Sequence, residues 1–364
     1  MKKIMLVFGT RPEAIKMCPL VRELRSRSGL RVAVCVTGQH REMLYGAMSA
    51  FGVEADYDLS IMRQSQTLFD VTVGVIEGVR RALLRELPDI LLVHGDTTTA
   101  YAAALAAFYL KIPVGHVEAG LRTWDVHSPY PEEFNRQSLG ILAAYHFAPT
   151  ERARDNLLRE GRDESRVFLV GNTVIDALRI TVRENFSHPI LEWIGKNRLV
   201  LLTSHRRESL GEPQRRIFRA VRRVAEERED VRVVYPVHMN PAVRDAAAET
   251  LGGCSQIRLI EPPDTVEFHN LLARCYLVLT DSGGIQEEAP AFGKPTLVLR
   301  DTTERPEGVE AGVARLVGTD GEKIYREFSR LLDDGTAYAA MSCAANPYGD
   351  GLASLRIADI LESL

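Results

Sequence analysis

Short apolar runs alternate with longer amphipathic stretches along the whole chain. Most of the short runs are rich in Val, Ile and Leu and are continuously apolar, rather than alternating apolar and polar residues. Continuous apolar runs are typical of parallel strands that are covered on both faces. The pattern therefore predicts strand–helix–strand repeats with right-handed crossovers, and an α/β fold built from doubly wound parallel sheets.

The repeat occurs twice, which predicts two domains. Strands are expected at residues 4–8, 32–37, 90–93, 114–117, 145–148, 200–203, 231–235, 257–260, 277–280, 296–299 and 314–316. Amphipathic helices are expected between them, for example at 67–87, 213–229 and 322–332. A boundary near residues 170–174 places an N-terminal domain at 1–172 and a C-terminal domain at 173–348. Residues 349–364 are expected to form a helix that packs back on a domain, with the N-terminal domain as the candidate.

Composition and charge limit the classes of protein to which this chain could belong. A length of 364 residues fits two domains, and a net charge of −4 gives no general support for binding nucleic acid or a membrane surface. The longest apolar stretch, 100–110, is too short to span a bilayer, and the N-terminal apolar run is too short for a signal peptide. Five scattered cysteines without a C-x-x-C pair favour reduced thiols in a cytoplasmic protein.

Three acidic positions lie just after predicted strands or in connecting loops. They are Asp96 in H-G-D-T-T-T-A, Glu118 in G-H-V-E-A-G-L-R-T-W and Glu132 in P-E-E-F-N-R. Partial desolvation in such places can raise a carboxyl pKa towards neutrality, so these residues are candidates for acid/base catalysis. The alternative is that they cap helices or pair with arginine. Their clustering in sequence favours a site.

Two further loops have features of anion-binding sites. After the first strand, G-T-R-P-E-A-I-K places Arg11 and Lys16 near a helix N-terminus. It matches neither G-x-G-x-x-G nor a P-loop, so a dinucleotide cofactor has no support there. After another strand, D-S-G-G-I-Q-E-E offers a backbone nest for a diphosphate and an acidic residue for ribose hydroxyls. For each loop, the alternative is an ordinary strand–helix turn with solvated charges.

Other polar loops also follow predicted strands. S-H-R-R-E-S carries His205, which could bind a phosphate or move a proton, and Y-P-V-H-M-N-P carries His238. In the loop R-D-T-T-E-R, Arg300 and Arg305 could neutralise phosphate charge or form surface ion pairs. The nine histidines are spread singly, without metal-ligand spacing, so no metal site is expected.

Together, these motifs resemble those of the non-hydrolysing UDP-N-acetylglucosamine 2-epimerases. The matching segments are 9–17, 38–44, 94–99, 115–123, 131–136, 204–209, 280–290 and 300–307, in order along most of the chain. The resemblance implies two Rossmann-like domains of the glycosyltransferase-B type, with the active site in the cleft between them. It also implies interconversion of UDP-N-acetylglucosamine and UDP-N-acetylmannosamine without a redox cofactor, by a homodimer in cell-surface polysaccharide biosynthesis.

The resemblance also implies roles for individual residues. UDP would leave by anti elimination, forming a 2-acetamidoglucal, and would add back after protonation of the other face. Asp96, Glu118 and Glu132 would lie near the sugar, and His205 would assist the diphosphate and proton transfer. The division of acid and base roles among the carboxylates stays open. The UDP contacts would be Arg11, Lys16, Phe268 (near the uracil), Ser282, Gly283, Gly284, Glu288 and Arg305.

Some bacterial members resemble one another in binding a regulatory UDP-N-acetylglucosamine beside the catalytic UDP. The matching residues here would be Gln39, His40, Arg41 and His238, but Ser65 stands where those members carry arginine. Several other functions stay open. They are an epimerase of a 2,3-diacetamido uronic acid derivative, a hydrolysing epimerase, a glycosyltransferase and a UDP-sugar sensor without turnover.

Overall fold

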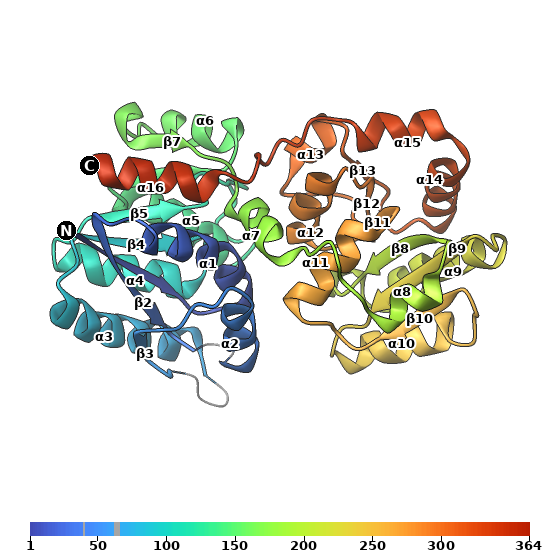
Figure 1. Cartoon of the computed structure of the whole chain (residues 1–364), viewed down its shortest axis with the longest axis horizontal. Coiled ribbons are helices and arrows are strands. Elements are labelled where there is room, and N and C mark those ends of the chain that lie inside the picture. The colour runs from blue at the N-terminus through green and yellow to red at the C-terminus, as the bar shows by residue number, and fades with distance from the viewer. Residues whose placement is uncertain (39–40, 62–65) are drawn as a thin grey trace. The chain divides into compact units, whose positions relative to one another are not determined.

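The structure is a computed structural model that describes residues 1–38, 41–61 and 66–364. It divides into two compact units (Figure 1). Unit 1 combines Met1–Thr181 with Tyr348–Leu364, and unit 2 is Val182–Pro347. The chain therefore leaves unit 1 after residue 181 and returns to it at residue 348.

Unit 1 is built on a parallel sheet with the strand order β3-β2-β1-β4-β5-β6-β7. Its strands are β1 (Lys2–Phe8), β2 (Leu30–Val36), β3 (Tyr57–Asp58), β4 (Ile90–His94), β5 (Val114–Val117), β6 (Tyr145–Ala148) and β7 (Val167–Leu169). Its helices are α1 (Arg11–Arg25), α2 (Arg41–Ala50), α3 (Leu68–Glu86), α4 (Thr98–Tyr109), α5 (Glu132–Leu142), α6 (Glu151–Arg159), α7 (Thr173–Thr181) and α16 (Ala353–Ser363).

Unit 2 repeats the plan with a parallel sheet in the order β10-β9-β8-β11-β12-β13. Its strands are β8 (Arg198–Thr203), β9 (Val231–Pro236), β10 (Ile257–Ile260), β11 (Leu277–Thr280), β12 (Thr296–Val298) and β13 (Ala314–Leu316). Its helices are α8 (Pro189–Ile194), α9 (Glu212–Glu226), α10 (Pro241–Leu251), α11 (Thr265–Arg274), α12 (Gly283–Glu288), α13 (Pro306–Glu310), α14 (Gly321–Asp333) and α15 (Gly335–Ser342).

The expected α/β class with two parallel sheets is confirmed, and each predicted strand position carries a strand. Two strands of unit 1 were missed. β3 has two residues, and β7 has three, of which Leu169 is exposed. Both are too short to produce a long apolar run, so the sequence pattern carried no clear signal for them.

Alternate residues of the central strands enter different cores, which explains the continuous apolar runs. On β1, Ile4, Leu6 and Phe8 pack into the core shared with α1 and α16, whereas Met5 and Val7 pack into the core shared with α3 and α4. Because both faces of the strand are buried from Ile4 to Phe8, each of these positions is apolar.

Helix α16 completes a core of unit 1 (Figure 1). Ile357, Ala358 and Leu361 are fully buried in the same cluster as the apolar face of α1. The buried Asp176 of α7 accepts hydrogen bonds from the backbone N–H groups of Ala353 (3.2 Å) and Ser354 (2.7 Å), which anchors the start of α16.

Each sheet has one point, between two neighbouring strands, from which the chain connections run in opposite directions along the sheet. In unit 1 this point lies between β1 and β4, and in unit 2 it lies between β8 and β11. The loops that follow these four strands leave in opposite directions along the sheet, and such points are where doubly wound sheets bind ligands. In each unit, the candidate residues are therefore sought in and around these loops.

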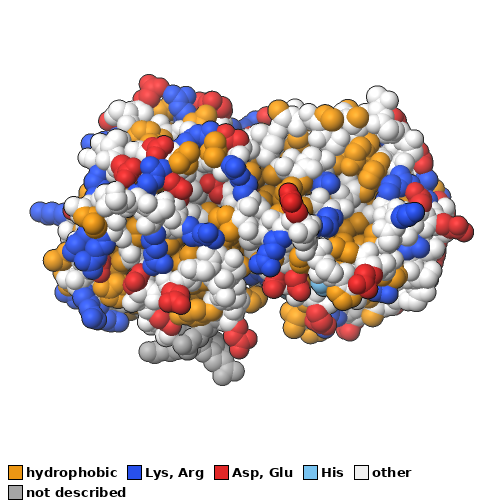
Figure 2. Space-filling view, in the orientation of Figure 1, with side chains coloured by type: hydrophobic (Ala, Val, Ile, Leu, Met, Phe, Trp, Pro, Cys, Tyr) orange, Lys and Arg blue, Asp and Glu red, His pale blue; other side chains and the backbone are white. Residues whose placement is uncertain are grey.

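No helix in the described part of the chain is long and apolar enough to cross a membrane. On the face drawn in Figure 2, Lys and Arg side chains are interspersed with Asp and Glu side chains. This surface agrees with the small net charge of −4.

Two neighbouring strands of unit 1 hold buried histidines, and we expect these to make the folded state less stable in acid. Burial lowers the pKa of His116 to about 3 and that of His146 to about 4, although the bond from His116 Nε2 to the Gly95 carbonyl (2.8 Å) opposes the shift of His116. Both rings stay neutral in the folded state while the unfolded chain binds protons below its ordinary histidine pKa. The free energy of unfolding should therefore fall as pH drops below about 6.5, by about 1.4 kcal/mol per pH unit for each histidine.

Urea unfolding at about pH 7.5 and about pH 5 measures this loss, to which His116 alone should contribute about 2 kcal/mol. A His116→Gln variant, which keeps a donor for the Gly95 carbonyl, should lose correspondingly less stability. An identical loss in the variant and the native chain would contradict this explanation.

Candidate active site

The turn after β1 is packed too tightly for any residue except glycine at its first position. A Cβ on Gly9 would lie 2.0 Å from Thr37 Oγ1 and 2.9 Å from Thr99 Oγ1. Thr10 then caps α1, and Glu13 closes the capping box. The predicted UDP contact Arg11 is the first residue of α1 and is partly exposed. The turn therefore presents a helix N-terminus at the edge of the sheet where the site is expected.

A buried carboxylate, Glu13, joins this turn to the loop after β4. It accepts hydrogen bonds from the backbone N–H groups of Gly9 (3.0 Å) and Thr10 (2.8 Å), and from the Thr97 hydroxyl (2.7 Å). Burial raises its pKa, although the bonds from Thr97, Gly9 and Thr10 oppose the shift. Glu13 thus fixes the backbone next to Asp96. Glu13 lies within the motif G-T-R-P-E-A-I-K, but its role as an anchor was not predicted from the sequence.

Glu118 and Lys16 form an ion pair, and both side chains are about nine-tenths buried. Asn172 also donates to Glu118 (3.2 Å), and the buried His94 Nε2 lies 3.6 Å from the same oxygen. Glu118 adopts a left-handed backbone conformation (φ 62°), which an L-residue keeps only where its surroundings enforce it. Lys16, predicted to contact UDP, therefore also holds a predicted catalytic carboxylate.

Asp96 is partly exposed and pairs with an arginine. Such pairing was the alternative to acid/base catalysis that the sequence left open. Arg136 Nε (3.1 Å) and Nη2 (2.7 Å) both donate to Asp96 Oδ2. The same guanidinium donates to the fully buried Glu133 (3.2 Å). The ion pair does not bury Asp96, whose side chain is 24% exposed, so its carboxylate stays accessible.

Glu132 opens α5 beside this pair. Its Oε2 is buried and, within the described residues, has no hydrogen-bond partner. The next residue, Glu133, accepts bonds from the backbone N–H groups of Thr123 and Trp124. Burial opposes ionisation of Glu133, but these bonds and its side-chain partners lower its pKa overall. The two glutamates thus differ: Glu133 is bonded at both oxygens, whereas Glu132 keeps one oxygen without a hydrogen-bond partner among the described residues.

In unit 2, the loop after β11 leads into α12 at Ser282. No side-chain hydrogen bond from Ser282 caps this helix, and Gly283 and Gly284 are its first residues. A Cβ on Gly283 would lie 3.1 Å from Glu304 Oε1, which is a tight contact with the end of that side chain. The backbone at the predicted diphosphate nest is consequently close to the loop that carries Arg300 and Arg305.

Three arginines surround Glu304 at this turn. Arg300 (2.7 Å), Arg206 (3.2 Å) and Arg305 (3.7 Å) each have a nitrogen near its carboxylate. Burial opposes ionisation of Glu304, but the charges of Arg305 and Arg300 lower its pKa to about 2. Arg305 also pairs with Glu287 (2.7 Å). Arg300 Nε lies 3.4 Å from Glu208 Oε1 as well, so the predicted phosphate-neutralising arginines belong to a network in which several carboxylates balance their charge.

The two remaining predicted UDP contacts lie on α11 and α12. Phe268 is partly buried and packs against the core formed by α8, α11 and β8. Glu288 is 9% exposed, and its Oε2 lies 3.9 Å from His269 Nε2. Both side chains are held by the core of unit 2, which suits fixed contacts to a base and a ribose.

His205 lies in the loop after β8, with its side chain 37% exposed. Its ring stacks on that of His238, with 5.2 Å between centroids and 10° between planes. Burial lowers the pKa of His205; Asp281 opposes the shift and His238 reinforces it. Of the other predicted regulatory residues, Arg41 begins α2, and Gln39 and His40 lie outside the described residues, as does Ser65. The regulatory site stays a prediction.

The comparisons with known proteins agree with these motifs. The family model of UDP-N-acetylglucosamine 2-epimerase matches residues 22–362. A UDP-N-acetylglucosamine 2-epimerase of Bacillus subtilis is 55% identical over 359 residues, covering 99% of this chain and 94% of the relative. The chain belongs to this family.

Solved structures of the family share the fold. A putative UDP-N-acetylglucosamine 2-epimerase from Listeria monocytogenes superposes with a TM-score of 0.94 at 53% identity, covering 100% of this chain and 96% of the other. The UDP-GlcNAc 2-epimerase from Neisseria meningitidis, solved with UDP-GlcNAc bound, gives 0.92 at 44% identity, with full coverage of both chains. The family is one of isomerases, and the resemblance found in the sequence is confirmed.

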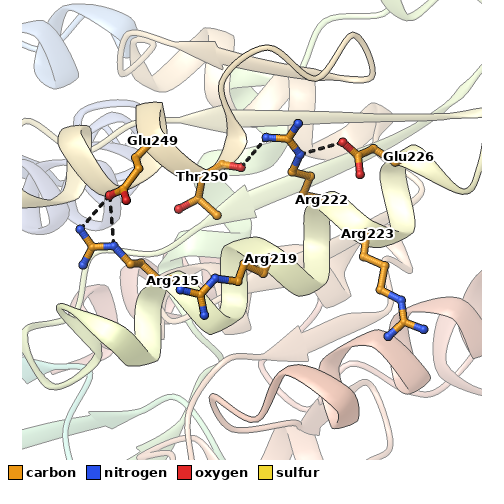
Figure 3. Close-up of a pocket in the computed structure, with 7 residues that line it drawn as sticks. All are labelled: Arg215, Arg219, Arg222, Arg223, Glu226, Glu249 and Thr250. Carbon is orange, nitrogen blue, oxygen red and sulfur yellow. Dashed lines mark hydrogen bonds and ion pairs between the residues drawn. The ribbon is translucent and has the colours of Figure 1, made fainter.

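A pocket of about 400 Å³ on α9 is lined mainly by arginine and glutamate side chains that do not belong to the family motifs. Figure 3 shows Arg215, Arg219, Arg222 and Arg223 lining it, with Glu226, Glu249 and Thr250. Arg215 pairs with Glu249 (2.9 Å) and Arg222 with Glu226 (2.7 Å). Since these charges are paired along an exposed helix face, we interpret the pocket as part of a surface ion-pair network.

Metal binding was the other chemistry considered for the acidic and histidine residues. Across the described ranges, no group of three or more His, Cys, Asp or Glu side chains is arranged to hold a metal ion. The carboxylates of unit 1 instead contact Lys16 and Arg136.

We expect a strong energetic coupling between Lys16 and Glu118, because both side chains of this ion pair are buried. Replacing Lys16 with Met leaves the Glu118 charge buried, and should lower the free energy of unfolding by about 3 kcal/mol. Adding Glu118→Gln should restore part of that loss, because the uncompensated charge is removed. A double-mutant cycle measured by urea unfolding gives the coupling energy.

The exposed pair Arg215–Glu249 is the matched control, with side chains 34% and 65% exposed. Its coupling should stay below about 1 kcal/mol. Equal coupling energies for the two pairs would show that burial does not strengthen the Lys16–Glu118 interaction.

Proposed function

We propose that this chain interconverts UDP-N-acetylglucosamine and UDP-N-acetylmannosamine by inverting C2 of the sugar. The observation that carries the proposal is the family membership over nearly the whole chain, joined to carboxylates at the strand ends of unit 1. Relatives named for this activity are 50–55% identical, and the Neisseria meningitidis enzyme, which is 44% identical, was solved with UDP-GlcNAc bound.

The chemistry needs both units in different ways. The C2 proton of an N-acetyl sugar is barely acidic, so UDP departs from C1 as the proton is removed. The C1–O bond breaks with its electron pair going to UDP, the C2–H electrons form the C1–C2 double bond, and a carboxylate receives the proton. Arg11, Arg305 and the nest at Ser282, Gly283 and Gly284 stabilise the charge that develops on the diphosphate. The assignment of acid/base catalysis to unit 1 and of UDP binding to unit 2 is part of this proposal.

The second half of the reaction reverses these steps on the other face of the sugar. A protonated group delivers a proton to C2 of the 2-acetamidoglucal, and UDP adds back to C1 as the double bond is consumed. Glu132 Oε2, buried and without a hydrogen-bond partner among the described residues, supports a role in one of these transfers. Asp96 and Glu118 differ in their cationic partners, which supports different roles for the two.

The alternatives differ in substrate or outcome. A related 2-epimerase would act on a 2,3-diacetamido uronic acid derivative, and a hydrolysing epimerase would release free sugar. A glycosyltransferase would use the same UDP nest, but would not need three carboxylates at the sugar. A sensor without turnover would need none of this acid/base set.

The remaining expectations concern assembly and cellular context. Large apolar side chains are exposed on three adjacent helices of unit 1: Phe69 and Val73 on α3, Phe108 and Tyr109 on α4, and Phe134 and Ile141 on α5. Exposed apolar patches mark association surfaces, and this one supports a homodimer formed through α3–α5. All five cysteines are free, which supports a cytoplasmic location, where the product would serve cell-surface polysaccharide synthesis.

Epimerisation in heavy water tests the reaction. UDP-N-acetylglucosamine incubated with the protein should gain deuterium at C2, because the proton removed exchanges with solvent before the return transfer. Mass spectrometry of the recovered UDP-sugars measures the incorporation. Folded protein that leaves the substrate unlabelled would rule out the proposal, and free sugar plus UDP as the product would identify a hydrolysing enzyme.

Asp96→Asn tests the site assignment. The amide cannot exchange a proton as a carboxylate does, so kcat should fall by about 10²–10⁴-fold while UDP binding persists. The matched control is the same change at the exposed Asp155 of α6, which should leave kcat unchanged. Full activity of Asp96→Asn would remove Asp96 from the catalytic set.

A further inference from the structure

One carboxylate in unit 2 has no part in the function described so far. Asp281 follows β11 and is 0% exposed. Its Oδ2 accepts hydrogen bonds from two successive backbone N–H groups, those of His205 (2.6 Å) and Arg206 (2.9 Å). These bonds hold the loop after β8 against the end of β11. They satisfy one carboxylate oxygen only.

The other oxygen points to the His205 ring. Among the described residues, no side chain or backbone group makes a hydrogen bond to the buried Asp281 Oδ1; the His205 Nδ1 atom lies 3.4 Å away but does not meet hydrogen-bond geometry. A buried carboxylate oxygen without a partner is costly, and an N–H on Nδ1 would satisfy it. With the proton on Nδ1, the opposite ring nitrogen, Nε2, is left to exchange a proton with a bound group.

The His238 ring restrains the imidazole from its face. Its stack on His205, nearly parallel at 10°, limits rotation of that ring out of its plane. The β9 strand that precedes His238 is held to the same loop, since the Tyr235 hydroxyl donates to the Ser204 carbonyl (2.5 Å). The His205 ring is thus oriented at its edge by Asp281 and at its face by His238.

We propose that Asp281 is the positioning residue of His205: it selects the Nδ1–H tautomer, aims Nε2 at the reacting diphosphate and stabilises the imidazolium that forms when Nε2 takes up a proton. The role of His205 rests on the function proposed above. The pairing of Asp281 with His205 rests on the geometry alone. It is the arrangement by which a buried aspartate orients the histidine of hydrolytic triads.

The charges that face His205 determine how its titration should respond. Asp281 favours the imidazolium from the end of β11, and His238 disfavours it from the loop after β9. In its own loop, Arg206 disfavours the imidazolium and Glu208 favours it. Replacing Asp281 with a neutral residue removes the buried, closely placed anion, so the pKa of His205 should fall.

Asp281→Asn tests the proposal in the intact chain. The amide keeps an acceptor for the backbone N–H groups but carries no charge. We expect kcat to fall about 10²-fold with KM changed less than about 3-fold, and the acid limb of the kcat–pH profile to move to lower pH. Asp281→Glu, which keeps the charge, should recover part of the rate.

Asp176→Asn is the matched control, because Asp176 is also a buried carboxylate that accepts two successive backbone N–H groups but faces no histidine. It should lower stability without moving the pH profile. An Asp281→Asn variant that folds and keeps the native pH profile would overturn the proposal, as would an equal shift in the control.

A measurement on the native protein separates this inference from the proposed function. In ¹⁵N-histidine-labelled protein, with the His205 signals assigned by a His205→Gln variant, the neutral ring should show its proton on Nδ1. The Nε2–H tautomer would overturn the proposal even if Asp281→Asn does not fold. If the native protein shows no epimerase activity, the proposed function fails, while the tautomer still decides the pairing.

Discussion

In each unit, a buried carboxylate holds together the two loops at which the sheet changes direction. Glu13 binds the turn after β1 and the Thr97 hydroxyl after β4, and Asp281, after β11, binds the loop after β8. Paired threonines reinforce the second junction, since the Thr203 and Thr280 hydroxyls are 2.6 Å apart. Parallel strands cannot be joined by tight hairpins, so their carboxyl-end loops need such cross-links to hold a defined shape. Glu13 thereby fixes the backbone beside Asp96, and Asp281 fixes the backbone at His205.

The candidate residues of the two units are polar in different ways. In unit 1, the candidate carboxylates are balanced pair by pair, as in Lys16–Glu118 and Arg136–Asp96. In unit 2, three arginines share Glu304. Paired carboxylates suit proton transfer at a neutral carbon, whereas several guanidinium groups gathered at one turn suit a leaving group that gains negative charge.

The sequence predicted the fold class and most strands because two-sided burial leaves a continuous apolar run, as on β1. It also identified the loops that carry the candidate residues, because glycine, acidic and basic residues there interrupt those runs. It did not identify Glu13 or Asp281 as anchors, since each lies inside a motif in which every polar residue looked equally available. Their roles follow from burial and from partners on neighbouring strands, such as Thr97, which lies 84 positions from Glu13. The Lys16–Glu118 pair could not be predicted from the sequence either, because its residues are 102 positions apart.

The packing of α16 has a consequence for how the chain is made. During synthesis, all of unit 2 leaves the ribosome before Ile357, Ala358 and Leu361, which belong to the core of unit 1. The apolar strip that α16 covers on unit 1 is therefore bare while unit 2 is translated, and nascent unit 1 presents a surface for chaperones until its last helix arrives. Unit 2 has no such dependence, since its residues are continuous in the chain.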